Sequence, residues 1–180
     1  MARTSAVAAA VAAALMSPLP ATAQSDDDDT AFDRTNIGDW VVECLPGQTG
    51  PTGCQLYQRV LTNDPGIVAM AVAFVWSEER ESLQTQIAMP LGVLLSYAPQ
   101  LRIGDSYSTQ LAWSRCISDG CLVEGFTPPE TVQLMHNSQT ASITVLHPLE
   151  GEVSIPVSLR GFTQALEQIL PEGTLERILE

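Results

Sequence analysis

The amino-acid sequence predicts an all-β protein, an antiparallel β-sandwich with a short C-terminal helix. Segments of alternating apolar and polar residues recur at about ten-residue spacing between residues 36 and 157, which is typical of sandwiches and barrels rather than parallel sheets. The chain has 180 residues, 45% of them hydrophobic, which suits one globular core. An outer-membrane barrel shares the alternation but needs aromatic belts, and only 6% of the residues are aromatic.

The first 23 residues are predicted to be an export signal. Arg3 supplies a positive charge, residues 6–16 form an apolar stretch, and Ala21-Thr22-Ala23 is a small-x-small cleavage site. Prolines at positions 18 and 20 interrupt the stretch before it is long enough to span a bilayer. We therefore expect cleavage near Ala23 and a mature chain in the periplasm, attached to the outer membrane or secreted.

Residues 24–31 are predicted to be a disordered acidic leader, and residues 32–180 the sandwich domain. The leader carries four consecutive aspartates, Asp26 to Asp29, which repel one another and bury nothing. Carboxylates also favour hard cations, but this run lacks the alternating spacing and the turn glycine of a calcium loop. A solvated tail is the preferred interpretation, and cation binding remains the alternative.

Four cysteines follow the signal, and an even number in an exported chain indicates disulfides. Three pairings are possible. We favour Cys44 with Cys54 and Cys116 with Cys121, because each pair flanks turn residues, 46–51 in the first case and 118–120 in the second. A zinc site is disfavoured because the first spacing is too wide, and a redox pair because no Cys-x-x-Cys is present.

The predicted strands are placed by alternation and turn signals. Residues 37–44 and 54–60 alternate, a turn is expected at 63–66, and residues 67–76 are apolar almost throughout, as in a central strand. Residues 83–88 alternate again until Met89-Pro90-Leu91-Gly92, where proline cannot donate to a ladder. Further strands are expected at residues 94–97, 100–103, 107–116, 122–126, 142–146 and 152–157.

Two helices are predicted. The first begins at Pro128-Pro129-Glu130 and runs to about Asn137, although residues 131–136 can also be read as a strand. The second follows from apolar residues at helical spacing between Leu159 and Leu170, and Pro171-Glu172-Gly173 ends it.

Charge and motif content exclude several classes of function. The net charge is −13 and the eight basic residues are all arginines, so nucleic acid and anionic lipid are not expected partners. His136 and His147 are the only histidines, and neither belongs to a nucleophile elbow, a metal-binding pair or a Cys-His arrangement. We predict no enzymatic activity, no cofactor and no metal; a hydrolase using either histidine is the least favoured alternative.

The aromatic residues suggest a second class of function. Trp40 and Trp113 are expected to point into the core, whereas Trp76 ends its strand beside a polar connection that contains Glu78, Glu79 and Glu81. A small-molecule or glycan site is therefore an alternative to a protein-contact role, and its pocket would be lined by Trp76, Tyr57 or Tyr97.

A set of spaced motifs resembles one known family. The motifs are Asp39-Trp40-x-Val42-x-Cys44, Cys54-x-Leu56, Met89-Pro90-Leu91-Gly92, Cys116 with Gly120-Cys121, and Val157-Ser158-Leu159-x-Gly161-Phe162-x-x-Ala165-Leu166. Their order and spacing, from Phe32 to Leu170, resemble the invasion-associated locus B family. The aspartate run departs from the family pattern but lies outside the domain.

The resemblance implies an immunoglobulin-like β-sandwich in an exported protein of the bacterial envelope. It implies contact with an envelope or host protein, a role in virulence, and no established catalytic residues. Pro90 and Gly92 belong to the turn motif, and physical reasoning predicts roles for two of the other motif residues. Trp40 is expected to pack against the first disulfide or the opposing sheet, and Gly161 to let the helix that starts near Phe162 approach the sandwich closely.

Overall fold

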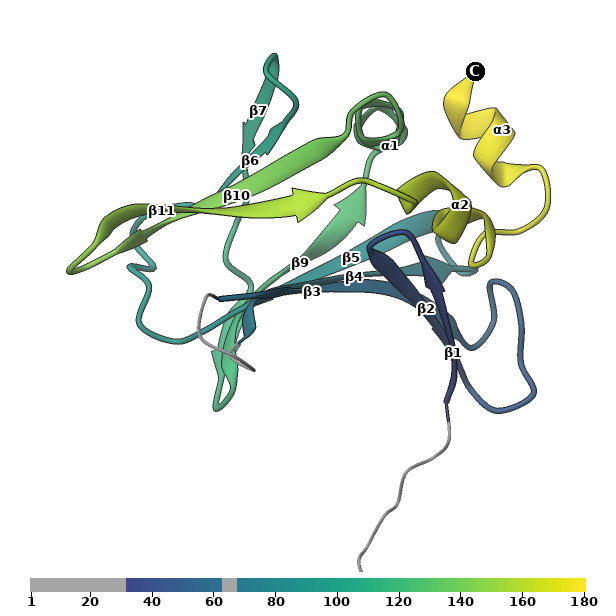
Figure 1. Ribbon diagram of the computed structural model, residues 1–180, viewed down its shortest axis with the longest axis horizontal. Helices are drawn as coiled ribbons and strands as arrows, with labels where there is room; N and C mark the ends of the chain where they lie inside the picture. The colour runs from purple at the N-terminus through teal and green to yellow at the C-terminus, as the bar shows by residue number, and fades with distance from the viewer. Residues whose placement is uncertain (1–31, 63–67) are drawn as a thin grey trace, which may run out of the picture.

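The fold consists of two antiparallel sheets that face each other (Figure 1), as a computed structural model describes it for residues 32–62 and 68–180. This arrangement confirms the predicted fold class. The predicted signal (1–23), the acidic leader (24–31) and the expected turn at residues 63–66 lie outside the described residues.

The larger sheet contains seven strands within the described part of the chain. Their order across the sheet is β1 (Asp33–Ile37), β2 (Trp40–Cys44), β3 (Cys54–Leu61), β4 (Val68–Ser77), β5 (Ser82–Met89), β9 (Gly120–Thr127) and β8 (Arg115–Ile117). Strand β4 is central, and its alternation explains its position. Met70, Val72 and Phe74 are buried on the inner face, and Ala71, Ala73 and Val75, which alternate with them, are half-buried on the outer face.

The smaller sheet contains four strands in the order β11 (Gly151–Ser158), β10 (Thr140–His147), β6 (Gln100–Ile103) and β7 (Tyr107–Gln110). The β10–β11 hairpin extends to one end of the molecule, on the left of Figure 1. Pro156 lies in the edge strand β11 and is exposed. Proline is tolerated at such an edge because it has no N–H to donate.

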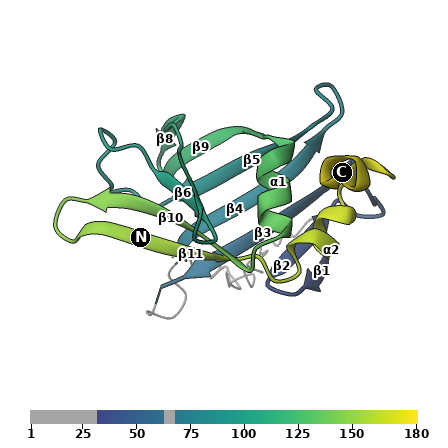
Figure 2. The same ribbon diagram turned by 90° about the horizontal axis from the view of Figure 1, so that it is seen from above.

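Three short helices gather at the opposite end from the hairpin, as Figure 2 shows from above. They are α1 (Pro129–His136), α2 (Phe162–Glu167) and α3 (Thr174–Leu179). The helix predicted from Pro128 is therefore confirmed. Helix α2 ends at Glu167, before the stop predicted at Pro171-Glu172-Gly173. Helix α3 was not predicted, and α2 is shorter than the apolar spacing indicated because Leu159 to Gly161 form a turn.

Three strand predictions are wrong. Residues 37–44 form two strands, because Gly38 and Asp39 make a two-residue turn between Ile37 and Trp40. Residues 94–97 form a loop in which the Tyr97 N–H donates to the Leu94 carbonyl. Residues 107–116 are split into β7 and β8, which belong to different sheets, since the chain crosses between the sheets at residues 111–114.

Candidate functional site

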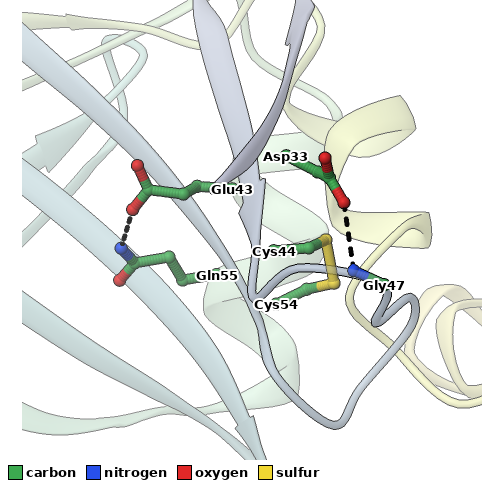
Figure 3. The surroundings of a disulfide bond; sticks show 6 residues. All are labelled: Asp33, Glu43, Cys44, Gly47, Cys54 and Gln55. Atoms are coloured by element: carbon green, nitrogen blue, oxygen red, sulfur yellow. Dashed lines mark hydrogen bonds between the residues drawn. A yellow bond between two sulfur atoms is a disulfide. The ribbon is translucent and has the colours of Figure 1, made fainter. Parts of the chain in front are cut away.

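The first cysteine pair closes the β2–β3 hairpin. Cys44 and Cys54 are cross-strand neighbours and form a disulfide (Figure 3). The loop between them is held against β1, because the Gly47 N–H donates to Asp33 Oδ2 over 3.2 Å. The disulfide therefore fixes the base of a loop whose residues are half-buried or exposed.

The second pair, Cys116 and Cys121, closes the β8–β9 hairpin in the same way. The two residues are cross-strand neighbours, and the turn between them contains Ser118 and Asp119. Strand β8 has only three residues, all exposed, so the disulfide holds a strand that buries little surface of its own.

A buried carboxylate lies beside the first disulfide, on the outer face of the larger sheet. Glu43 accepts from Arg34 Nε and from Gln55 Nε2, both over 2.6 Å (Figure 3 shows the Gln55 contact). Burial raises the pKa of Glu43, but the hydrogen bonds from Arg34 and Gln55 lower it more, so its pKa lies below the usual value. The three side chains join β1, β2 and β3, which is a structural arrangement rather than a reactive one.

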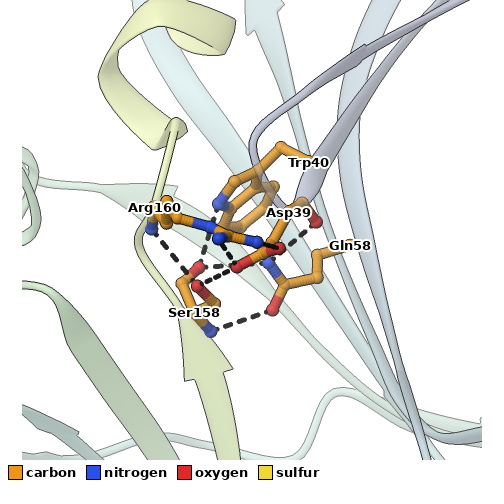
Figure 4. Close-up of polar contacts among 5 residues, drawn as sticks. All are labelled: Asp39, Trp40, Gln58, Ser158 and Arg160. Atoms are coloured by element: carbon orange, nitrogen blue, oxygen red, sulfur yellow. Dashed lines mark hydrogen bonds and ion pairs between the residues drawn. The ribbon is translucent and has the colours of Figure 1, made fainter.

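Trp40 is fully buried at the centre of an aromatic cluster. Its ring centroid lies 5.7 Å from that of Phe74 and 5.3 Å from that of Phe162. Its indole N–H donates to the carbonyl of Ser158 over 3.0 Å, which reaches the last strand of the opposing sheet (Figure 4). Trp40 therefore joins the two sheets and helix α2.

Polar groups around Trp40 complete the connection between the sheets (Figure 4). The side chain of Gln58, only 6% exposed, donates to the carbonyls of Asp39 and Ser158 and accepts from the Ser158 N–H. Asp39 forms an ion pair with Arg160 and accepts from the Ser158 hydroxyl over 2.6 Å. We call Asp39, Gln58, Ser158 and Arg160 the inter-sheet clamp.

The clamp depends on two glycines that contact each other. A Cβ atom on Gly161 would lie 2.5 Å from the Ile37 carbonyl oxygen, and one on Gly38 would lie 2.3 Å from the Arg160 carbonyl oxygen. Both residues have positive φ, which favours glycine. A close approach was predicted for Gly161 but not for Gly38, although a Gly-Asp pair inside an alternating segment is a hairpin signal.

The turn after β5 leads into an exposed apolar surface. Strand β5 ends at Met89, Pro90 follows, and Gly92 has a φ of 103°. The Leu94 N–H then donates to the Leu146 carbonyl, which places this loop beside the β10–β11 hairpin. We call the exposed leucines of the loop and the hairpin tip the leucine surface: Leu91 (56% exposed), Leu94 (38%), Leu95 (53%) and Leu149 (90%).

The two histidines lie in different elements and make local contacts. His136 Nδ1, at the end of α1, is 3.0 Å from the Thr163 hydroxyl. His147 Nδ1, at the end of β10, accepts from the backbone N–H groups of Leu149 and Glu150. Within residues 32–62 and 68–180, no group of three or more His, Cys, Asp or Glu residues could hold a metal ion.

The aromatic residues proposed for a ligand pocket are not brought together. Trp76 lines a cleft of about 490 Å³ between the β4–β5 turn and α3, beside Glu78, Glu81 and Arg177. Tyr57 instead points to the outer face of β3, where the Arg59 guanidinium lies 5.7 Å from its ring centroid. The Tyr97 hydroxyl contacts Glu152 near the hairpin. Trp76 therefore lines a cleft, while Tyr57 and Tyr97 lie in other parts of the fold.

Comparisons with known proteins give one consistent result. Residues 40–170 match the family described as Invasion associated locus B (IalB) protein. Invasion protein B homologs of Brucella abortus strain 2308 and of biovar 1 strain 9-941 are each 26% identical over 133 residues, covering 73% of this chain and 75% of theirs.

The crystal structure of invasion associated protein B from Bartonella henselae has a similar fold. Its TM-score is 0.63 at 20% sequence identity, covering 74% of this chain and 93% of that one. Among the described residues, no helix has the length and apolarity needed to cross a bilayer.

Proposed function

Because the chain belongs to the Invasion associated locus B (IalB) family, we propose that it is an exported, non-enzymatic protein of the bacterial envelope that acts by contact with another protein. The relatives it resembles carry names that refer to invasion. We extend the proposal to contact with a host protein on that basis.

The leucine surface is the observation that carries the proposal. Leu149 is 90% exposed at the tip of a hairpin, and three further leucines lie in the loop hydrogen-bonded to that hairpin. Exposed apolar side chains gathered in one region are typical of a surface that a partner covers. The partner would present an apolar face, because apolar side chains are the ones that it would cover.

The disulfides support export. An oxidising compartment lets such bonds persist, whereas cytosolic thiols are kept reduced. Protein recovered from the periplasmic fraction of the native host should begin at Gln24 and contain no free thiol, measured by intact mass before and after alkylation. A chain that keeps Met1 or alkylates without reduction would contradict export.

The contact function is tested by crosslinking capture with envelope extracts and, separately, with host-cell extracts. The bait is the full mature chain, compared with the double variant Leu95→Glu and Leu149→Glu. Ile117→Glu is the matched control, since Ile117 is 48% exposed on β8 in the other sheet. We expect at least a tenfold loss of one captured protein with the double variant only.

The two extracts distinguish an envelope partner from a host partner. Equal capture by the double variant and the wild type would overturn the role of the leucine surface. Absence of any protein above background in both extracts would overturn the contact function itself.

A further inference from the structure

The two sheets enclose a cavity between their inner faces. It lies between β4, β5 and β9 of the larger sheet and β6, β7, β10 and β11 of the smaller one, and its volume is about 340 Å³. Helix α1 contributes Thr131 and Met135 to its wall, and the crossing segment contributes Leu111 and Ala112. The volume lies in the range of small-molecule sites in proteins, which is about 300 to 1,000 Å³.

The wall of the cavity is mainly apolar and comes from the inner faces of both sheets. The apolar side chains include Phe74, Ile87, Leu101, Val123, Ile143 and Val157. Hydroxyl groups of Thr85, Thr109 and Thr127 add a few polar positions, and Thr85 and Thr127 contact each other through their hydroxyl oxygens. An apolar wall with few polar groups is the usual composition of a site for an uncharged organic molecule.

No charged side chain in the wall is available to a ligand among the described residues. Among residues 32–62 and 68–180, Glu124 is the only Asp, Glu, Arg, Lys or His that lines the cavity. Its carboxylate is engaged on the outer face of β9, where it accepts from Arg115 over 2.9 Å and from Gln86 over 3.1 Å. Burial of a carboxylate or ammonium group without a partner is costly, and the net charge of −13 repels anions further.

Gly125 opens the cavity at its mouth. It shares the inner face of β9 with Val123 and Thr127, and it is paired with Thr85 of β5. A Cβ atom built on Gly125 would meet no atom within 4 Å, and the φ of this glycine is not positive. The missing side chain therefore leaves space, rather than allowing a turn or a close backbone approach.

We propose that this cavity binds an uncharged, mainly apolar small molecule whose hydroxyl or carbonyl group hydrogen-bonds to the threonine side chains. The ligand enters between β7 and β9, where Gln110 and Gly125 are exposed. The site is separate from the leucine surface, so this proposal does not depend on the contact function.

Two dyes with the same skeleton test the proposal. N-phenyl-1-naphthylamine is uncharged, and 1-anilino-8-naphthalenesulfonate differs from it by one sulfonate. We expect saturable binding of the uncharged dye to the mature full chain with one site per molecule, measured by fluorescence titration. The anionic dye should bind at least tenfold more weakly.

Gly125→Leu fills the mouth of the cavity and should weaken binding of the uncharged dye at least tenfold. Gln84→Leu is the control, because it places the same side chain on the exposed outer face of β5. Far-ultraviolet circular dichroism and the melting temperature establish that both variants are folded. If Gly125→Leu does not fold, Thr109→Phe on the inner face of β7 replaces it, with the same expectation.

Three results would overturn the proposal. They are absence of saturable binding of the uncharged dye to the wild type, equal binding to wild type and the filled variant, and equal affinity for the two dyes.

Discussion

The contact between Gly38 and Gly161 places the backbones of the β1–β2 turn and the α2 start within reach of each other. The Asp39 N–H donates to the Arg160 carbonyl over 3.1 Å at this point. Any side chain on Gly161 would displace the Ile37 carbonyl, which is backbone and cannot rotate away.

Comparing substitutions at Gly161 and Gly173 separates the energetic cost of the close backbone approach from the cost of a positive φ. Gly161→Ala and Gly173→Ala both impose an unfavourable φ, at 83° and 73°, and both precede a helix. Only Gly161 contacts backbone, since a Cβ on Gly173 meets nothing within 4 Å. Gly161→Ala should therefore destabilise by about 1 to 3 kcal/mol more, measured by urea unfolding. Equal losses in the two variants would show that the backbone contact is unimportant.

The Asp39–Arg160 pair makes stability depend on pH. Hydrogen bonds from Arg160 and Ser158 lower the pKa of Asp39 below its ordinary 3.8. A lowered pKa means that the pairing stabilises the fold above pH 3.8 and that this contribution disappears as pH falls through the folded-state pKa. Asp39→Asn should lower the melting temperature at pH 7, and the difference from wild type should shrink at pH 3 and pH 2. A difference that is constant with pH would contradict this role.

At the scale of elements, the two disulfides close hairpins whose strands differ in burial and in pairing with neighbouring strands. Strand β2 buries Trp40, Val42 and Glu43 and pairs on both sides, whereas β8 is a short, exposed edge strand. The loops between the cysteines are short, so each bond is expected to contribute about 2 to 3 kcal/mol through the unfolded state.

Removing each disulfide should therefore have similar effects on stability but different effects on structure. In the double variant Cys44→Ser and Cys54→Ser, β2 and β3 should stay paired. In the double variant Cys116→Ser and Cys121→Ser, the backbone amides of β8 should lose protection from hydrogen exchange. Hydrogen exchange reports the pairing, and urea unfolding reports the free energy. Retained protection in β8 would mean that the ion pair between Arg115 and Glu124 holds this strand without the disulfide.

The limits of sequence interpretation are clearest for strands that change partner. Alternation and turn residues predicted most strands because a half-buried strand imposes a period of two on its residues. The same period continued through residues 107–116, although β7 and β8 lie in different sheets. Periodicity tells which residues share a face, but it carries no information on which sheet receives the strand.

At the scale of the whole molecule, the sheets are joined along one side and separated along the other. Gln58 and Ser158 link β3 to β11, whereas the cavity separates β4, β5 and β9 from the smaller sheet. The alternation of residues 54–60 puts Gln58 on the same face as Cys54 and Leu56, but its partner Ser158 lies 100 positions away in the sequence. The cavity likewise depends on how far the sheets diverge, which no local pattern specifies.

Gln58→Leu tests the joined side. The change removes the acceptor of the Ser158 N–H and the side-chain donor to the Asp39 carbonyl, while the Ser158 carbonyl keeps the Trp40 indole N–H. Unsatisfied buried groups are expensive. We expect a loss of about 3 kcal/mol in the free energy of unfolding. Gln84→Leu, at an exposed position of β5, should change it little. A loss as small as that of Gln84→Leu would show that the clamp is not needed to hold the sheets together.

Pro156 has a consequence for how copies of this chain meet. Along the β11 edge, one outward-facing donor is replaced by a ring, so a neighbouring strand cannot continue the hydrogen-bond ladder there. Sheet extension from molecule to molecule, the route to fibrils, is interrupted on this side. The chain is thereby protected from polymerising along that edge.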